Sequence, residues 1–239
     1  MSSYNKNHPE SIQKMFNAIA KRYDAANALM SFNLHRQWNK KLINSLNDRY
    51  KDPVLLDLCS GTGDIAYEYL KEASKPSTVY LLDFSEEMLE VAKQKASKYG
   101  SDHDNIHCLL ADAQSIPLDD SSIPLATVAY GIRNVKDPYK CFQEVHRVLK
   151  PGGQFSILEL TQPSNPVLKL GHAIFLKTML PLIGRFATPD KEAYHYLCNS
   201  IQAFTPPEDL KLKLIQAGFS QCSIKSLNGG IATLFICKK

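Results

Sequence analysis

Three aspartates stand at positions where a carboxylate could bind a ligand. Asp57 lies in a short apolar run just before the glycine turn Gly61-Thr62-Gly63, and Asp83 ends the next apolar run. Asp112 ends the third such run. Glycines at a turn of this kind let the backbone approach a ligand closely, and a carboxylate at the place of Asp83 can accept hydrogen bonds from both hydroxyls of a ribose. The spacing therefore predicts a ligand that contains an adenosine.

Two classes of adenosine ligand fit this pattern, and the surrounding residues favour one of them. A dinucleotide calls for a third glycine where the helix packs after the turn, but Ala66 stands there. Asp57 would repel a pyrophosphate, whereas it could help to bind a ligand that carries an ammonium and a sulfonium. Asp112 and the small Ala113 suit an adenine, through a carboxylate for the exocyclic amine and a backbone N–H for a ring nitrogen. Helix-capping and turn roles are the alternative for the same aspartates.

The order of the apolar runs indicates how these residues are positioned. Short apolar runs alternate with helical segments between residues 54 and 160. This alternation is typical of parallel strands joined by crossover helices, and near-continuous apolar strands indicate a sheet that is covered on both faces. The expected strands are residues 54–59, 79–82, 106–111, 123–130 and 154–159, with a turn at residues 150–153 before the last of them.

Helical segments flank this core on both sides. Residues 1–52 and 166–204 have mostly helical patterns, and residues 207–217 are expected to form a further helix. Two final strands, 222–227 and 231–237, are joined by the hairpin signal Asn228-Gly229-Gly230. We therefore expect a single α/β domain over residues 1–239, with an N-terminal helical cap (1–52), a cofactor-binding core (53–160), a helical lid (161–205) and a C-terminal helix and hairpin (206–239).

Composition excludes several classes of protein. Hydrophobic residues make up 44% of the 239 residues and charged residues 22%, which predicts an ordinary globular fold and not a disordered chain. None of the six cysteines forms a CxxC pair, so zinc-finger and iron–sulfur spacings are absent and no metal is expected. No basic and apolar leader opens the sequence, which predicts a cytoplasmic protein with reduced thiols.

The net charge differs between regions of the chain. It is +5 over residues 1–52, −6 over residues 53–160 and +5 over residues 161–239. No dense run of Lys and Arg interleaved with aromatic residues is present, so no nucleic-acid partner is expected. The acidic core is consistent with a cationic cofactor. The basic flanks would suit transient peripheral contact with the inner face of an anionic membrane, and an unevenly charged soluble surface is the alternative. The sequence leaves open whether the chain forms a homo-oligomer.

These features together resemble the class I S-adenosylmethionine-dependent methyltransferases. The glycine turn with its aspartates, the string Lys150-Pro151-Gly152-Gly153 and the final hairpin match that family. The resemblance implies a Rossmann-like α/β fold with seven strands, helices on both faces of the sheet and an antiparallel final strand. It also implies S-adenosylmethionine as cofactor, bound at Thr62, Asp83, Asp112 and Ala113, which the pattern above extends to Asp57, Gly61 and Gly63.

Longer strings resemble one subfamily, the methyltransferases of ubiquinone and menaquinone biosynthesis. The resemblance covers about residues 15–237 and is carried by FNAIAKRYD at 16–24, HRQW at 35–38, YGIRNV at 130–135 and YHYL at 194–197. Cys59-Ser60 and Tyr130 stand where that family usually has smaller residues. Whether the side chain of Tyr130 contacts the cofactor is therefore open.

The subfamily resemblance implies a reaction, the C-methylation of a polyprenyl quinol that converts demethylmenaquinol to menaquinol. Deprotonation of a ring hydroxyl gives a phenolate, whose neighbouring carbon attacks the sulfonium methyl before the ring loses a proton. Arg133 can hold the phenolate but keeps its own proton, with Asn134 beside it and Tyr23 reaching in from the N-terminal helices. Asp24 and His35 are candidate proton acceptors.

Other functions stay open beside this one. The acceptor could be a polyprenyl methoxy-benzoquinol of ubiquinone biosynthesis or another small molecule, and the chain could be a non-catalytic, cofactor-binding scaffold of a quinone-synthesis complex. Residues 166–187 are mainly apolar, with their charges largely on one side. They are expected to form a lid helix, and a polyprenyl groove or a face that lies on the bilayer is the sharper hypothesis.

Overall fold

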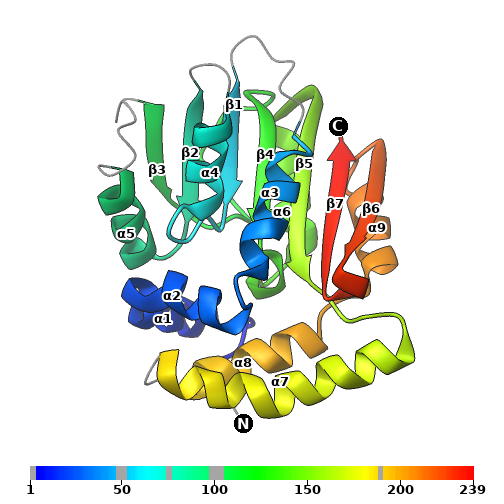
Figure 1. Cartoon of the computed structure of the whole chain (residues 1–239). Helices are drawn as coiled ribbons and strands as arrows, with labels where there is room; N and C mark the ends of the chain where they lie inside the picture. Colours follow the sequence, from blue (N-terminus) through cyan, green and yellow to red (C-terminus); the bar gives the residue numbers. More distant parts are fainter. Residues whose placement is uncertain (1–3, 47–52, 74–76, 97–104, 188–190) are drawn as a thin grey trace.

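The computed structural model describes residues 4–46, 53–73, 77–96, 105–187 and 191–239, and a seven-stranded sheet runs through its centre (Figure 1). The strand order is β3-β2-β1-β4-β5-β7-β6. Only β7 runs antiparallel to its neighbours β5 and β6, and the other pairs are parallel. The bounds are β1 Val54–Leu58, β2 Thr78–Asp83, β3 Ile106–Leu110, β4 Ile123–Ala129, β5 Leu149–Leu160, β6 Gln221–Leu227 and β7 Ala232–Lys238.

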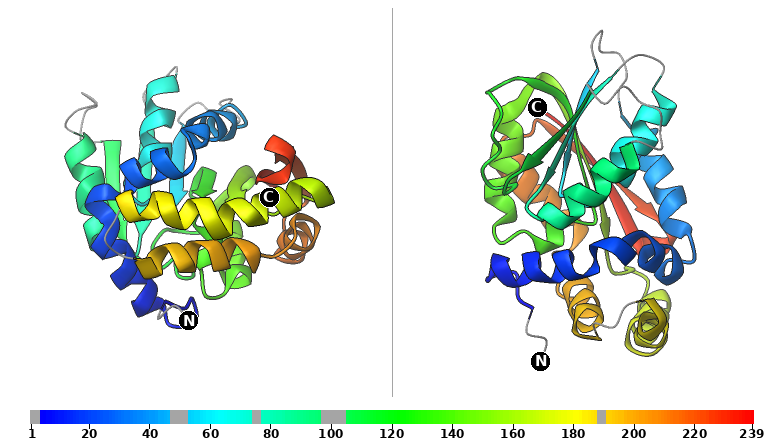
Figure 2. Two further views of the ribbon diagram at one scale, coloured as in Figure 1. Left: turned by 60° about the horizontal axis from the view of Figure 1, so that its bottom comes forward. Right: turned by 90° about the vertical axis from the view of Figure 1, so that its left-hand side faces the viewer.

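Helices cover both faces of the sheet, as the apolar strands require. Figure 2 shows α3 (Leu34–Ile43), α4 (Asp64–Glu72) and α5 (Glu86–Ala96) on one face, with α6 (Pro138–Val148) and α9 (Pro207–Gln216) on the other. One buried cluster joins α3, α4 and α5 to the sheet through Trp38, Ile65 and Leu89. The second joins α6 and α9 to the opposite face through Phe142 and Leu214. The core is thus two apolar layers that enclose the strands.

A third group of helices lies across the end of the sheet where the parallel strands finish (Figure 1). It consists of α1 (Pro9–Ile19) and α2 (Tyr23–Met30), here called the cap, and α7 (Pro166–Ala187) and α8 (Lys191–Gln202), here called the lid. Short 3-10 turns lie at Ala20–Arg22, Ile132–Asn134 and Asn228–Gly230. Among the described helices, none combines the length and the hydropathy that a membrane span requires.

The fifth strand is longer than the sequence predicts. The expected turn at residues 150–153 lies inside β5, because Leu149 already pairs with Ile123 and pairing resumes between Gln154 and Leu125. The extra residues form a bulge, in which Gly152 has a φ of +75°. Turn-forming residues are tolerated there because β4 holds the strand on both sides of the bulge.

The cysteines also differ from the prediction at one pair. Cys222 and Cys237 face each other in the register of β6 and β7, and the structure joins them in a disulfide. The prediction of reduced thiols is therefore wrong for this pair, whereas Cys59, Cys108 and Cys141 are free, as is Cys198 on α8. Fifteen positions separate the two partners in the sequence, so only the strand register brings them together.

Candidate functional site

An acidic crevice opens at the carboxyl ends of β1, β2, β3 and β4. It lies where the strand order reverses between β1 and β4, which is where open α/β sheets bind their ligands. Four of the predicted cofactor positions line it, namely Gly61, Asp83, Asp112 and Ala113. The cap closes it from below through Phe16 and Tyr23.

Asp83 is the most constrained of these residues. Its Oδ2 accepts a hydrogen bond of 2.8 Å from the backbone N–H of Gly61, and its Oδ1 accepts one of 2.8 Å from Ser85. Burial raises the pKa of this carboxyl to about 6, against the lowering effect of those backbone donors. Asp83 thus ties the glycine turn to the end of β2 and still presents its carboxylate to the crevice.

The three other predicted cofactor positions lie beside the crevice and do not line it. Asp57 is buried within the sheet, where its Oδ1 accepts a 2.8 Å hydrogen bond from Thr127, and burial raises its pKa to about 7. Gly63 has a φ of +81°, and a Cβ there would lie 2.6 Å from the ring of Tyr67. Thr62 donates from its Oγ1 to the cap residue Asp24, at 2.5 Å. Thr62 and Gly63 therefore form part of the turn, whereas Asp57 lies within β1 and bonds to β4.

A second, larger cavity of about 450 Å³ lies between the cap, the lid and α3. Its size is that of a small-molecule site, and its walls are mainly apolar. The walls include Met30, Phe32, Leu34, Trp38, Leu160, Val167, Leu168, Phe175, Leu176, Leu197, Ile201 and Ile231. The sequence suggested a groove only along residues 166–187, because the other walls come from segments up to 208 positions apart, from Tyr23 to Ile231, that pack only in the folded chain.

The acidic crevice and the apolar cavity share two tyrosines. Tyr23 and Tyr130 line both of them, and Arg133 lines the apolar cavity while Asn134 lines the crevice. The ring of Tyr23 comes within 3.8 Å of the place where a Cβ on Gly61 would lie. The predicted catalytic residues Tyr23, Arg133 and Asn134 are thus brought together at this junction.

Arg133 is held by a buried carboxylate. Its Nη1 lies 2.5 Å from Oε1 of Glu159 and also donates to the carbonyl of Tyr130, whereas its Nε has no hydrogen-bond partner among the described residues. Burial is the largest single effect and lowers the pKa of Arg133, but the charge and hydrogen bond of Glu159, together with Tyr23 and Tyr196, leave that pKa raised. Sequence reasoning missed Glu159, whose only signal was an acid within the apolar run of β5.

The lid reaches the same junction through Tyr196 on α8. Its hydroxyl donates to Oδ1 of Asn134 at 3.0 Å. Burial raises the pKa of Tyr196 to about 12, so the phenol keeps its proton near neutral pH and acts as a donor. The amide of Asn134 is therefore oriented from the lid side.

The two candidate proton acceptors have different surroundings. His35 lines the apolar cavity, where burial lowers its pKa, and its Nδ1 lies 2.6 Å from Oγ of Ser31. In the tautomer in which Nδ1 of His35 carries the proton and donates to Ser31, whose own hydroxyl donates to the carbonyl of Asn27, Nε2 keeps a lone pair. Asp24 lines neither cavity and is bonded to Thr62 and Lys95. Among the described residues, no group of three or more His, Cys, Asp or Glu could hold a metal ion.

The fold is that of the class I S-adenosylmethionine-dependent methyltransferases. A SAM-dependent methyltransferase from Aquifex aeolicus superposes with a TM-score of 0.63 at 18% identity. The match covers 93% of this chain and 97% of that one. A second such structure, from Thermotoga maritima, has a TM-score of 0.63 at 16% identity and covers 95% and 98% of the two chains. The predicted fold is confirmed, including the antiparallel final strand.

Sequence comparison gives the family within that fold. The model of the ubiE/COQ5 methyltransferase family matches residues 3–239. A demethylmenaquinone methyltransferase of Protochlamydia amoebophila is 49% identical over 234 residues, which cover 98% of this chain and 97% of that protein. One from Staphylococcus aureus is 35% identical over 232 residues, covering 97% and 94%. The chain belongs to the ubiE/COQ5 methyltransferase family, as the sequence predicted, and is a methyltransferase.

Proposed function

We propose that this chain transfers the methyl group of S-adenosylmethionine to a ring carbon of demethylmenaquinol and so forms menaquinol. The observation that carries the proposal is the junction where an acidic crevice meets a large apolar cavity at Tyr23, Tyr130 and Arg133. A soluble cationic cofactor and an apolar acceptor need two such compartments with one shared wall. The relatives named demethylmenaquinone methyltransferase, up to 49% identical, support the choice of acceptor.

The crevice residues fit S-adenosylmethionine, which supplies a methyl group on a positively charged sulfur. Asp83 is placed to accept from the ribose hydroxyls, and Asp112 and Ala113 to meet the adenine, at the ends of neighbouring strands. Carboxylates there favour the positive charge of the cofactor. Gly61 admits it because its φ of +53° and the absence of a side chain let the turn come close.

The apolar cavity fits the quinol, with its polar groups at the inner end. Arg133 stabilises the developing phenolate through its positive charge, because its guanidinium stays protonated beside Glu159 and the residue lines the apolar cavity. Tyr23 and Asn134 align the ring with the crevice. His35 accepts the proton on its free Nε2, since its lowered pKa keeps the imidazole neutral.

The polyprenyl tail then extends towards α7, and we infer that this helix contacts the membrane surface. Val167, Leu170 and Ile174 recur on one side of α7, and their side chains are 54–78% exposed. Leu168 and Gly171, which line the apolar cavity, lie on the same helix. An apolar helix face in water marks an interaction surface, and a bilayer would cover it while supplying the substrate.

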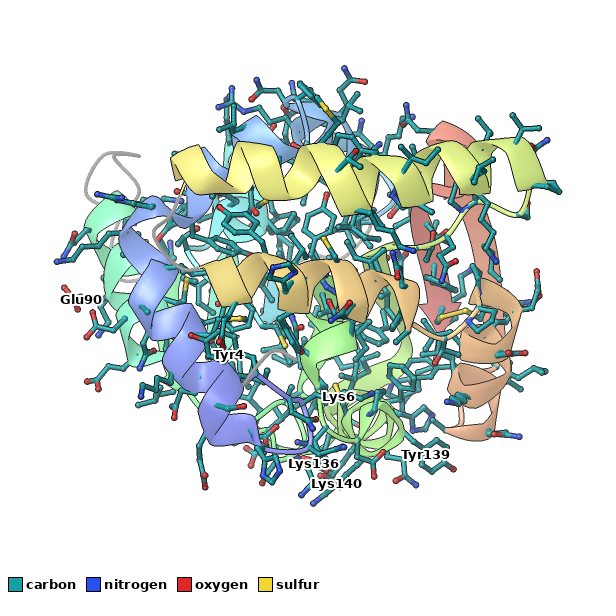
Figure 3. All side chains as sticks on the ribbon, turned by 90° about the horizontal axis from the view of Figure 1, so that it is seen from below. Tyr4, Lys6, Glu90, Lys136, Tyr139 and Lys140 are labelled. Atoms are coloured by element: carbon teal, nitrogen blue, oxygen red, sulfur yellow. A yellow bond between two sulfur atoms is a disulfide. The ribbon has the colours of Figure 1, made fainter. Side chains whose placement is uncertain are left out.

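Charges around this end of the molecule support a lipid partner. Figure 3 shows the end from below, with α7 and α8 side by side and the exposed Lys136 and Lys140 at one rim. Lysines at such a rim suit anionic headgroups. A cytoplasmic protein with peripheral membrane contact is the localisation that follows from this proposal.

The reaction is tested by offering two acceptors separately. The purified chain is incubated with S-adenosylmethionine and either reduced demethylmenaquinol or a reduced polyprenyl methoxy-benzoquinol, and mass spectrometry detects the added methyl. We expect the naphthoquinol to gain one methyl group. Methylation of the benzoquinol alone would replace the proposal with a role in ubiquinone biosynthesis. Cofactor binding without methylation of either acceptor would favour a scaffold.

Membrane contact is tested by flotation on phosphatidylglycerol vesicles. We expect the chain to float and the double variant Val167→Glu, Ile174→Glu to stay in solution. The matched control is Leu212→Glu, since Leu212 is 61% exposed and lies on α9, which packs against β6, β7 and α6. Equal flotation of all three would overturn the membrane proposal. A change of mass in solution, seen by light scattering for the double variant alone, would instead make the face of α7 a homo-oligomer interface.

A further inference from the structure

A polar cluster, whose four residues line neither cavity, links the cap to the glycine turn. It contains Asp24 on α2, Thr62 in the turn, Asp64 at the start of α4, and Lys95 on α5. Oγ1 of Thr62 donates to Oδ1 of Asp24 at 2.5 Å, and Nζ of Lys95 pairs with Oδ2 of Asp24. The same Nζ donates to Thr62 at 3.0 Å and to Asp64 at 2.7 Å. We call these four residues the clasp.

The clasp is partly shielded from water, so its hydrogen bonds and ion pairs are stronger than those of a fully exposed cluster. Thr62 is buried, and the side chain of Lys95 is only 19% exposed. Burial alone would lower the pKa of Lys95, but Asp64 and Asp24 outweigh burial and leave that pKa raised, so the ammonium is charged. Lys95 therefore neutralises two carboxylates that would otherwise repel each other, and it joins three elements in doing so.

Asp24 directly follows Tyr23, the residue that lines both the acidic crevice and the apolar cavity. Both residues lie in the first turn of α2, so fixing the carboxylate of Asp24 fixes the backbone that carries the phenol. Two further bonds fasten the cap to the loop after β2. Gln13 donates to the carbonyl of Phe84, and Ser85 donates to Asn17, each at 2.5 Å. Each of these bonds ends in a loop that follows a strand beside the crevice.

We propose that Asp24 is a positioning residue which, held by Thr62 and Lys95, sets Tyr23 against the glycine turn and so couples the closed cap to the reacting centre. The sequence offered Asp24 as a proton acceptor. Its carboxylate is occupied by Thr62 and Lys95 and lines neither cavity, so it acts through Tyr23. Lys95, on α5, is a second positioning residue, because its ammonium holds the carboxylate of Asp24 in place. The inference rests on the proposed methyl transfer, because its consequences are measured as turnover.

A double-mutant cycle tests whether Asp24 acts through Tyr23. We expect Asp24→Ala to lower kcat about tenfold or more at saturating cofactor, since small displacements of an aligned group are costly. On a Tyr23→Phe background the same change should have little further effect, because residues that act as a unit are not additive. Asp24→Asn should retain more activity than Asp24→Ala, because its amide oxygen can still accept from Thr62.

Lys95→Met is the second probe, with Lys93→Met as its matched control on the same helix. Lys93 is exposed, and its ion pair with Glu90 is weak because the two charged atoms are 4.0 Å apart in water. Its loss should therefore leave kcat unchanged. Lys95→Met should lower kcat and speed amide hydrogen exchange in α2. Losses of Asp24→Ala and Tyr23→Phe that simply multiply, or equal rates for the two lysine variants, would overturn the proposal.

Binding of S-adenosylhomocysteine, measured by calorimetry, separates this failure from failure of the proposed function. If the unaltered chain binds this ligand and methylates demethylmenaquinol, the proposed function stands whatever the clasp variants do. If the unaltered chain methylates no quinol, the proposed function fails. Hydrogen exchange in α2 then still decides whether Lys95 holds the cap, because that readout needs no turnover.

Discussion

The two halves of the candidate site are built from different kinds of structure. The acidic crevice is made mainly by turns at the ends of four parallel strands, whereas the apolar cavity is walled largely by the cap, the lid and α3. Strand ends sit in a rigid sheet with Asp83 tied to Gly61 by a backbone hydrogen bond. The helices that form the cavity meet through side chains. The crevice is thus set by sheet topology, and the cavity by which helices lie across the end of the sheet.

The sheet belongs to a fold that solved structures share. Those at 16–18% identity have TM-scores of 0.63, and that likeness concerns the fold alone. A common sheet can hold a common cofactor site while added helices select the acceptor. Changes in the crevice should therefore affect the cofactor, changes in the cavity should affect the acceptor, and changes at their junction should affect turnover itself.

The junction should give the largest effect. Arg133→Met removes the proposed phenolate donor and should lower kcat by about 100-fold to 1,000-fold, with binding of S-adenosylhomocysteine nearly unchanged. The same change leaves Glu159 buried without its partner and should cost about 3–5 kcal/mol of unfolding free energy. Kinetics and denaturant unfolding measure the two effects.

The paired variant Arg133→Met, Glu159→Gln separates stability from chemistry. Replacing both charges removes the unpaired carboxylate, so much of the lost unfolding free energy should return. The kcat should stay as low as in Arg133→Met. Recovery of activity together with stability would mean that Arg133 only supports the fold.

A change at Leu168, an exposed residue that lines the apolar cavity, should have an intermediate effect that is confined to the acceptor. Leu168→Glu places a carboxylate where the polyprenyl tail would lie, and burying it is unfavourable. We expect the KM for a long-tailed quinol to rise at least about tenfold, with less effect on a tail-less quinol and none on the KM for the cofactor. Leu212→Glu on α9 is the control. A shift in the KM for the cofactor would show that the cavity does not act on the acceptor alone.

The pH dependence of cofactor binding should be the smallest effect. Burial raises the pKa of Asp83 to about 6, and its ionised form is the better acceptor for ribose hydroxyls. Affinity for S-adenosylhomocysteine should therefore fall as the pH drops below 6, by at most about tenfold per unit. Calorimetry between pH 5 and pH 8, values chosen to bracket about 6, measures this, and Asp83→Asn should bind weakly with a flatter profile.

Stability of the ligand-free chain should change in the opposite direction. A carboxyl whose folded pKa is raised binds more protons in the folded state than in the unfolded state, so unfolding free energy falls as the pH rises through that range. Asp83 and Asp57, with pKa values of about 6 and about 7, both act in this sense. Asp57→Asn should reduce the slope, as seen by urea unfolding. If unfolding free energy depends on pH as steeply in that variant as in the unaltered chain, Asp57 does not contribute to the pH dependence.

Much of the crevice could be predicted from the sequence because its signals are local. The strand, the glycine turn and the helix after it are consecutive, so the position of Gly61 could be read from the chain itself. Asp83 and Asp112 follow from the rule that parallel strands end at the same edge of a sheet. The same local rule did not separate Gly61, which lines the crevice, from Thr62 and Gly63, which do not. That difference depends on which way each residue of the turn faces after folding.

The sequence by itself determined the class of fold, the family and the place of the acidic crevice, because periodicity, turn residues and family strings are local properties. Only the tertiary structure decided that Glu159 holds Arg133, that Asp24 binds Thr62 and Lys95, and that Cys222 meets Cys237. The apolar cavity belongs to the same group, since its walls come from α2, α3, α7 and α8. Such partners are far apart along the chain, and packing of helices and register of strands alone bring them into contact.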